Sequence, residues 1–216
     1  MLDSTFITTL QHQLSQPLPG PTAQIKMASG TRKKFPTIPA NAKEACVLCL
    51  LYLKNNEWHI VLTQRVSTNT NDRHSGQMSF PGGKYEPTDS TYENGALRET
   101  EEEVGIAADD ITILGKLTPL YIPVSNFYVH PFVGVLDYVP AFTPEVQEVQ
   151  EIVETPLSLL LEDSTRQITD LTIRGYAIKE VPYFNVYGKV VWGATAMMLS
   201  EFVDIIKESK VVINSL

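Results

Sequence analysis

The sequence lacks a long apolar run, a second pair of cysteines and an excess of basic residues. Without an apolar run long enough to cross a membrane, and without a signal-peptide pattern, we expect a soluble cytoplasmic protein with no membrane partner. The formal net charge of -8 argues against a nucleic-acid partner, because such proteins neutralise phosphates with basic surface. A small phosphorylated substrate is still compatible, since a bound metal ion reverses the local sign of the field.

Cysteine and histidine are too sparse for the common zinc or redox sites. The two cysteines, Cys46 and Cys49, form a lone C-x-x-C inside the apolar segment ACVLCLLYL. Residues three apart in a strand point to opposite faces, so the sequence predicts two buried core thiols. The four histidines show no H-x-x-x-H spacing, and we expect His59 to be structural.

What the sequence does contain is the composition of one globular domain. At 43% hydrophobic and 19% charged, 216 residues are enough for a substantial core. We expect residues 1–39 to form an N-terminal helix and arm packing on the domain, and residues 40–216 to form the domain itself. Apolar periodicity predicts strands at 45–53, 58–65, 77–80, 111–120, 127–137, 172–179 and 186–192, and helices at 5–16, 90–104, 145–151, 156–162 and 194–208.

Four glutamates crowd the last turns of the helix expected at residues 90–104. They are Glu99, Glu101, Glu102 and Glu103. Asp89, Ser90 or Thr91 can cap the start of this helix, and Gly105 is the residue type favoured just past its end. The glutamates therefore lie at the negative end of the helix dipole, where ordinary stability favours lysine.

Three of these carboxylates are predicted to share one side of the helix. At about 100° per residue, Glu99, Glu102 and Glu103 fall within an arc of roughly 100°. Leu97 and Val104 lie on the opposite side, and the fourth glutamate lies outside the arc. Clustered carboxylates repel one another unless a cation lies between them, and Mg²⁺ or Mn²⁺ suits oxygen ligands. The alternative is an acidic solvated face, which is what most charge runs are.

The exact letters favour the metal site. The pattern R-E-x-x-E-E-x-G is formed by Arg98, Glu99, Glu102, Glu103 and Gly105. At average residue usage it should occur by chance on the order of 10⁻⁶ per start position. With the glycine pair upstream, this segment resembles the Nudix box. That family hydrolyses a nucleoside diphosphate linked to another moiety, and its α/β fold, a mixed β-sheet sandwiched between helices, is the fold we expect.

The resemblance implies a role for each matching residue. It implies that Glu99, Glu102 and Glu103 are catalytic metal ligands. The carbonyl of Gly83 is a further candidate ligand. Arg98 and Gly105 are implied to be structural, the arginine by orienting a carboxylate.

The early half of the box departs from the family pattern. Asp89 lies six positions after Gly83, as in the family, but nine rather than eight before Arg98, and it replaces the usual Glu. This spacing, with an upstream L-T-x-R and G-x-x-x-F-P-G-G, resembles the coenzyme A pyrophosphatase subfamily. The implied substrate-binding residues are Arg65, His74, Gly76 and Phe80. The polar residues 67–71 could equally form a plain surface connection, and the basic run 32–34 is expected to be a solvated loop.

Segments downstream of the box continue the resemblance, which covers roughly residues 40–205. Glu148 or Glu151 is expected to complete the metal shell or to take the proton of the attacking water, and the sequence does not choose between them. The implied reaction cleaves coenzyme A or acyl-CoA into 4′-phosphopantetheine, or its acyl form, and adenosine 3′,5′-bisphosphate.

Other readings stay open at this point. Within the enzyme class, the alternative small-molecule nucleotide substrates are ADP-ribose, NADH, dinucleoside polyphosphates and oxidised nucleotides. A non-catalytic nucleotide-binding module is the alternative from another class, although such modules usually lose the box glutamates that are intact here. An exposed apolar edge could support a homodimer, but no residue pattern establishes one.

Overall fold

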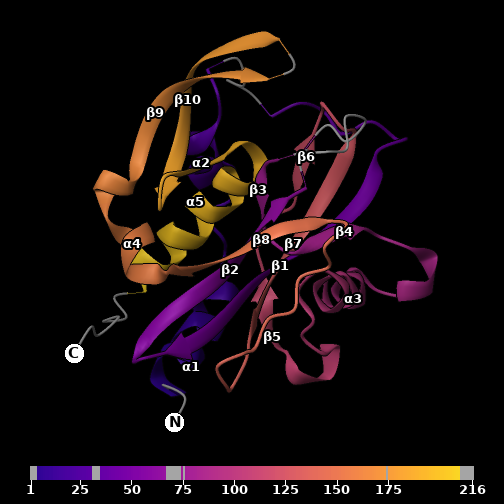
Figure 1. Cartoon of the computed structure of the whole chain (residues 1–216), viewed down its shortest axis with the longest axis vertical. Coiled ribbons are helices and arrows are strands. Elements are labelled where there is room, and N and C mark those ends of the chain that lie inside the picture. The colour runs from indigo at the N-terminus through magenta and orange to yellow at the C-terminus, as the bar shows by residue number, and fades with distance from the viewer. Residues whose placement is uncertain (1–3, 31–34, 67–73, 75, 174, 210–216) are drawn as a thin grey trace.

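The computed structural model describes residues 4–30, 35–66, 74, 76–173 and 175–209. The loop 67–71 and the basic run 32–34 lie outside the described residues. A mixed eight-stranded sheet forms the centre, and a three-stranded antiparallel sheet lies beside the C-terminal helix (Figure 1). None of the described helices combines the length and apolar character that a membrane crossing needs.

The central sheet has the strand order β3-β2-β1-β7-β5, with β4 also pairing β1, β6 pairing β7 and β8 pairing β2. Its strands are β1 (Lys43–Lys54), β2 (Glu57–Arg65), β3 (Met78–Ser79), β4 (Gly82–Lys84), β5 (Thr112–Lys116), β6 (Leu120–Ile122), β7 (Phe127–Val135) and β8 (Val149–Pro156). The pairing of β1 with β7 is parallel, and the other pairings are antiparallel.

The smaller sheet and the helices complete the described chain. The smaller sheet has the order β11-β10-β9 and consists of β9 (Arg166–Ile173), β10 (Tyr176–Val186) and β11 (Lys189–Trp192). The helices are α1 (Ser4–Leu14), α2 (Pro21–Gln24), α3 (Tyr92–Val104), α4 (Leu157–Leu161) and α5 (Gly193–Glu208), with 3₁₀ turns η1 (Ile25–Met27), η2 (Pro87–Asp89), η3 (Ala108–Asp110) and η4 (Asp163–Thr165).

Alternation along β1 builds a core on each face of the central sheet. Cys46 and Leu48 pack toward α3, while Cys49 and Leu51 pack toward α1 and α5. Both cysteines are free and fully buried, as the sequence predicted. The expected α/β/α arrangement is therefore confirmed, because side chains two apart in a strand share a face and each face is covered by helix.

Three element predictions differ from the structure. Residues 145–151, expected to be helical, instead lead into β8, which pairs antiparallel with β2. The strand expected at 172–179 spans the turn between β9 and β10, where Gly175 has a φ of 81°. The expected strand at 111–120 is divided into the end of β5 and the start of β6.

Candidate active site

Local chemistry sets both ends of α3. The Thr91 hydroxyl accepts a hydrogen bond from the Asn94 backbone N–H at 3.1 Å, so Thr91 is the N-cap among the three predicted candidates. At the other end, Gly105 has a φ of 73°, and its N–H donates to the Glu101 carbonyl at 2.9 Å. Glycine adopts this left-handed conformation without steric cost, which confirms the predicted helix end.

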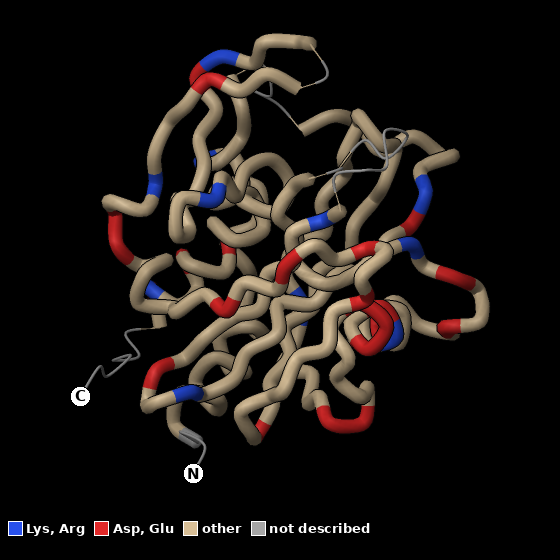
Figure 2. Tube along the Cα trace, viewed as in Figure 1, with Lys and Arg blue, Asp and Glu red and all other residues tan. Residues whose placement is uncertain are grey.

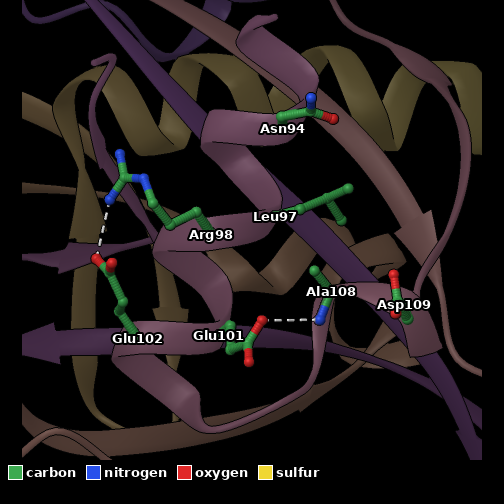
Figure 3. A pocket seen from close by; sticks show the side chains of 7 residues that line it. All are labelled: Asn94, Leu97, Arg98, Glu101, Glu102, Ala108 and Asp109. Carbon is green, nitrogen blue, oxygen red and sulfur yellow. Dashed lines mark hydrogen bonds and ion pairs between the residues drawn. The ribbon is translucent and has the colours of Figure 1, made fainter. Parts of the chain in front are cut away.

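The face of α3 that meets the sheet includes one of the box glutamates. The buried residues of the helix include Ala96, Thr100, Glu103 and Val104. Leu97 is partly buried against the same core cluster as Val104, and it also lines a depression beside the helix (Figure 3). A Cβ on Gly95 would lie 2.6 Å from the sulfur of Cys46, so only glycine allows the helix to approach the sheet this closely.

Two of the glutamates, Glu99 and Glu103, lie against the main chain of the glycine pair Gly82 and Gly83. The Gly82 N–H donates to Oε2 of Glu103 at 3.1 Å, and a Cβ on Gly82 would lie 2.4 Å from a backbone oxygen of β1. A Cβ on Gly83 would lie 2.3 Å from Oε2 of Glu99. Residues without side chains are therefore required where Glu99 and Glu103 converge on the main chain.

These two carboxylates are poorly solvated. Glu103 is 2% exposed, and burial raises its pKa to about 7, against the opposing effects of Arg65 and the Gly82 N–H. Burial also raises the pKa of Glu99, despite the neighbouring Arg98. Smaller contributions from neighbouring carboxylates, Glu148 among them, also raise the pKa of both, and a bound cation would relieve this repulsion.

Arg98 joins the two halves of the box. Its Nε donates to Oδ1 of Asp89 at 2.6 Å and its Nη2 to Oδ2 at 3.1 Å, which forms a bidentate ion pair. The arginine holds the pKa of Asp89 below its usual value. Ser90, between this aspartate and α3, has a φ of 65°. The ion pair thus forms despite the lengthened spacing between Asp89 and Arg98.

The donor set suits a hard divalent cation. In the described part of the chain, no three Asp, Glu, His or Cys side chains are already arranged to hold a metal ion. Instead, Nη1 of Arg98 donates to Glu99 at 3.0 Å and to Glu102 at 2.9 Å. The Glu102 side chain is 58% exposed, so it can leave this surface ion pair at small cost. The close approach of the Glu99 carboxylate to Gly83 and the burial of Glu103 fit oxygen coordination.

The fourth glutamate of the cluster has a different task. The Glu101 carboxylate accepts a hydrogen bond from the Ala108 N–H at 3.1 Å, which holds the turn after α3 (Figure 3). Its position outside the group of Glu99, Glu102 and Glu103 follows the predicted arc. Acidic residues gather along α3 and η3, whereas Lys and Arg are scattered over the molecule (Figure 2).

The four residues expected to bind substrate occupy different environments. Nη1 of Arg65 lies 3.4 Å from Oε1 of Glu103, at the edge of the acidic site. His74 is half-buried, with its Nδ1 3.1 Å from the Gln77 side-chain oxygen, and Gly76 lines a separate cleft. Phe80 is 1% exposed and packs in the core, so its side chain supports the loop rather than facing a ligand.

The two candidate glutamates after the box also lie apart. Glu148 is exposed, and its charge acts on Glu99 and Glu103. Glu151 instead pairs with Nζ of Lys189 at 2.7 Å. The sequence gives no sign of the role of Lys189, because no local pattern connects two residues that belong to different sheets.

Comparison with known proteins adds an independent observation. A sequence model of the NUDIX domain matches residues 42–170. The human mitochondrial coenzyme A diphosphatase NUDT8 is 33% identical over 178 residues, which cover 82% of this chain and 73% of that protein. An uncharacterized Nudix hydrolase of Yersinia pestis, NudL, is 33% identical over 197 residues, which cover 91% of this chain and 90% of that protein.

Solved structures show the same fold at lower identity. The Nudix hydrolase RenU from M. smegmatis has a TM-score of 0.54 and 13% identity, covering 84% of this chain and 94% of that one. The MutT protein from Methanosarcina mazei has a TM-score of 0.51 and 18% identity, covering 80% of this chain and 99% of that one. These similarities concern the fold alone.

Proposed function

The chain belongs to the Nudix family, a family of hydrolases of nucleoside diphosphate derivatives, and we propose that its substrate is coenzyme A or an acyl-CoA. Hydrolysis of the diphosphate bond then yields 4′-phosphopantetheine, or its acyl form, and adenosine 3′,5′-bisphosphate. The observation that carries the hydrolytic part is the convergence of Glu99 and Glu103 on the glycine pair. Burial raises the pKa of both carboxylates there, even though Arg98 lies beside Glu99 and Arg65 beside Glu103.

In this proposal, Glu99, Glu102, Glu103 and the Gly83 carbonyl hold Mg²⁺ or Mn²⁺. The cation supplies the charge neutralisation that a diphosphate needs before a nucleophile can approach it. The pairing of Arg98 with Asp89 holds the arginine beside Glu99 and Glu102 and so orients their carboxylates.

The proton of the attacking water is assigned to Glu148 rather than Glu151. Of these two glutamates, Glu148 is the one whose charge raises the pKa of both Glu99 and Glu103. The carboxylate of Glu151 instead forms an ion pair with Lys189. An exposed carboxylate beside the acidic site can accept a proton or complete the cation's ligands. Glu151 then belongs to a neighbouring part of the surface.

The choice of coenzyme A rests on the similarity to human NUDT8 and on the upstream motif. Arg65 lies at the acidic site and is placed to meet a phosphate of the substrate, and His74 and Gly76 follow it in the same motif. The homodimer and the cytoplasmic location stay predictions.

The proposal is tested by incubating the purified protein with Mg²⁺ or Mn²⁺ and coenzyme A, ADP-ribose, NADH or a dinucleoside polyphosphate in parallel. Products are identified by chromatography with mass detection. We expect preferential release of 4′-phosphopantetheine and adenosine 3′,5′-bisphosphate. Preferential turnover of another diphosphate would overturn the coenzyme A assignment and keep the reaction, and binding without any turnover would favour a nucleotide-binding module.

A further inference from the structure

The end of β2 presents neighbouring side chains to two different sites. Arg65 reaches Glu103 in the acidic site, whereas Gln64 lines an open cleft of about 360 Å³ between β2–β3 and the smaller sheet. The backbone N–H of Arg65 donates to the Gln77 carbonyl at 3.0 Å, and Gln77 lines the same cleft. The cleft therefore begins one residue along the chain from the acidic site, and its volume is in the range of small-molecule sites.

One wall of the cleft is apolar and belongs to the smaller sheet. Leu171 and Ile173 reach it from β9, and Trp192 reaches it from the end of β11. Along β9 Leu171 and Ile173 are half-buried, while Asp170 and Thr172, which alternate with them, are exposed on the other side. The period of two thus gives this strand one face toward the cleft and one toward solvent.

The polar groups of the cleft carry no net charge. Gln64 and Gln77 present side-chain amides, and Nζ of Lys189 lies 3.0 Å from Oε1 of Gln64. Lys189 is the one charged residue among the described residues that line the cleft, and Glu151 pairs with it at 2.7 Å. A phosphate would need an uncompensated cation here, whereas a neutral chain with amide groups finds both hydrogen-bonding partners and an apolar wall.

We propose that this cleft binds the uncharged, amide-bearing arm that a diphosphate substrate carries beyond the scissile bond. The inference rests on the proposed function and deepens it, because the pantetheine arm of coenzyme A has this chemistry. Gln64 and Lys189 orient the amides, and Ile173 and Trp192 cover the apolar part. The cleft thereby selects substrates by the arm rather than by the nucleotide.

The first test places a charge on either side of β9. In Ile173→Asp the carboxylate faces the cleft, and in the matched control Thr172→Asp it faces solvent one residue away. We expect Ile173→Asp to weaken binding of 4′-phosphopantetheine, measured by calorimetry, by at least about tenfold, while Thr172→Asp binds as the unmodified protein does. Equal binding by the two variants would overturn the proposal. Thermal unfolding of both variants verifies that they are folded.

The second test needs no substitution and holds even if Ile173→Asp fails to fold. Of the two tryptophans, Trp58 is 3% exposed and Trp192 lines the cleft, so quenching by acrylamide reports mainly on Trp192. We expect saturating 4′-phosphopantetheine to lower the quenching constant by about half, because the arm covers the indole. Unchanged quenching would overturn the proposal.

These outcomes separate the subsite from the proposed reaction. If coenzyme A is not hydrolysed but 4′-phosphopantetheine protects Trp192, the reaction is wrong and the subsite stands. If coenzyme A is hydrolysed with the same KM by Ile173→Asp and Thr172→Asp, the reaction stands and the subsite is wrong.

Discussion

Two buried glutamates on opposite faces of the central sheet differ in the donors that meet them. Glu201 on α5 is 0% exposed, and its carboxylate accepts hydrogen bonds from the Gly20 N–H at 3.1 Å and the Gln24 side chain at 2.9 Å. Thr118 adds its N–H and, at 2.6 Å, its hydroxyl. Glu103 on α3 is 2% exposed but has only the Gly82 N–H at 3.1 Å and a longer contact with Arg65 among the described donors.

The difference separates a structural carboxylate, Glu201, from Glu103, for which we propose a functional role. A buried charge is tolerated when hydrogen bonds replace its lost hydration. Glu201 meets this condition and ties the segment before β1 and the connection between β5 and β6 to α5. Glu103 does not meet it, and burial raises its pKa to about 7. A carboxylate with few protein donors suits the proposed cation site, because a bound ion would supply the missing partner.

The largest effect of a substitution on the rate of hydrolysis is expected at Glu103. Glu103→Gln should lower kcat by about a thousandfold, or roughly 4 kcal/mol of transition-state free energy, because a neutral amide is a poor cation ligand. Without metal, the variant should unfold at the wild-type temperature or above, since it removes a desolvated charge. Steady-state kinetics and thermal unfolding measure the two quantities.

The matched control is Glu101→Gln on the outer side of the same helix. Its carboxylate is exposed and bonds to the turn after α3, so the variant should keep the wild-type rate. A Glu103→Gln enzyme with near wild-type kcat would remove Glu103 from the mechanism and would make the two buried glutamates equivalent.

Glu201→Gln should give the opposite pattern of effects. Its NH₂ group would face several donors, so we expect a loss of about 2–3 kcal/mol in the free energy of unfolding, measured with denaturant. The rate per folded molecule should not change, because Glu201 lies outside the acidic site. Glu208→Gln, at the exposed end of α5, serves as the near-neutral control. Lost activity at full stability would contradict a purely structural role for Glu201.

The comparison also explains which features the sequence could predict. Local signals are sufficient for α3, since Thr91 and Gly105 mark its ends and the spacing of the box glutamates lies within one helix. The hydrogen-bond network around the Glu201 carboxylate has no such local signal, because its donors come from positions 20, 24 and 118. Sequence periodicity placed Leu97 with Val104, and both pack against one core cluster, but the close approach of α3 to Cys46 depends on Gly95, which periodicity does not reveal.

The error at β8 has a related cause. Val149, Ile152 and Val153 follow the i, i+3, i+4 spacing of a helix, so the segment is locally ambiguous. Hydrogen bonding to β2 makes the segment a strand, and no residue within the segment predicts that it pairs with β2. The same pairing places Glu151 opposite Gln64, which is why the sequence alone could not choose between the two glutamates of this region.

A smaller effect should distinguish Glu148 from Glu151. Glu148→Gln should lower kcat about a hundredfold, roughly 2.7 kcal/mol, because it removes the candidate proton acceptor. Glu151→Gln should leave kcat nearly unchanged and raise the KM for coenzyme A a few fold, since it frees Lys189 in the neutral cleft. Steady-state kinetics of both variants test this. The reverse ranking of kcat would move the catalytic role to Glu151.

The smallest effect is expected at Asp89, a third buried carboxylate whose charge is matched by an arginine. Its pKa is lowered by the hydrogen bonds from Arg98, so its stabilising effect is present above the ordinary carboxyl value of 3.8 and is lost as the pH falls through the lower folded-state value. Asp89→Asn should therefore cost about 1–2 kcal/mol in unfolding free energy at neutral pH, and the difference from wild type should shrink below 3.8.

Denaturant unfolding across this pH range measures the effect, with the exposed Asp109→Asn as control. A difference between Asp89→Asn and wild type that is unchanged at acidic pH would mean that Asp89 acts through packing rather than through its charge. The three buried carboxylates could then no longer be ranked by how many hydrogen-bond donors and positive charges surround each one. If the difference does shrink on acidification, Asp89 stands between the other two: its charge stabilises the fold, as at Glu201, but is paired with a positive charge, as proposed for Glu103.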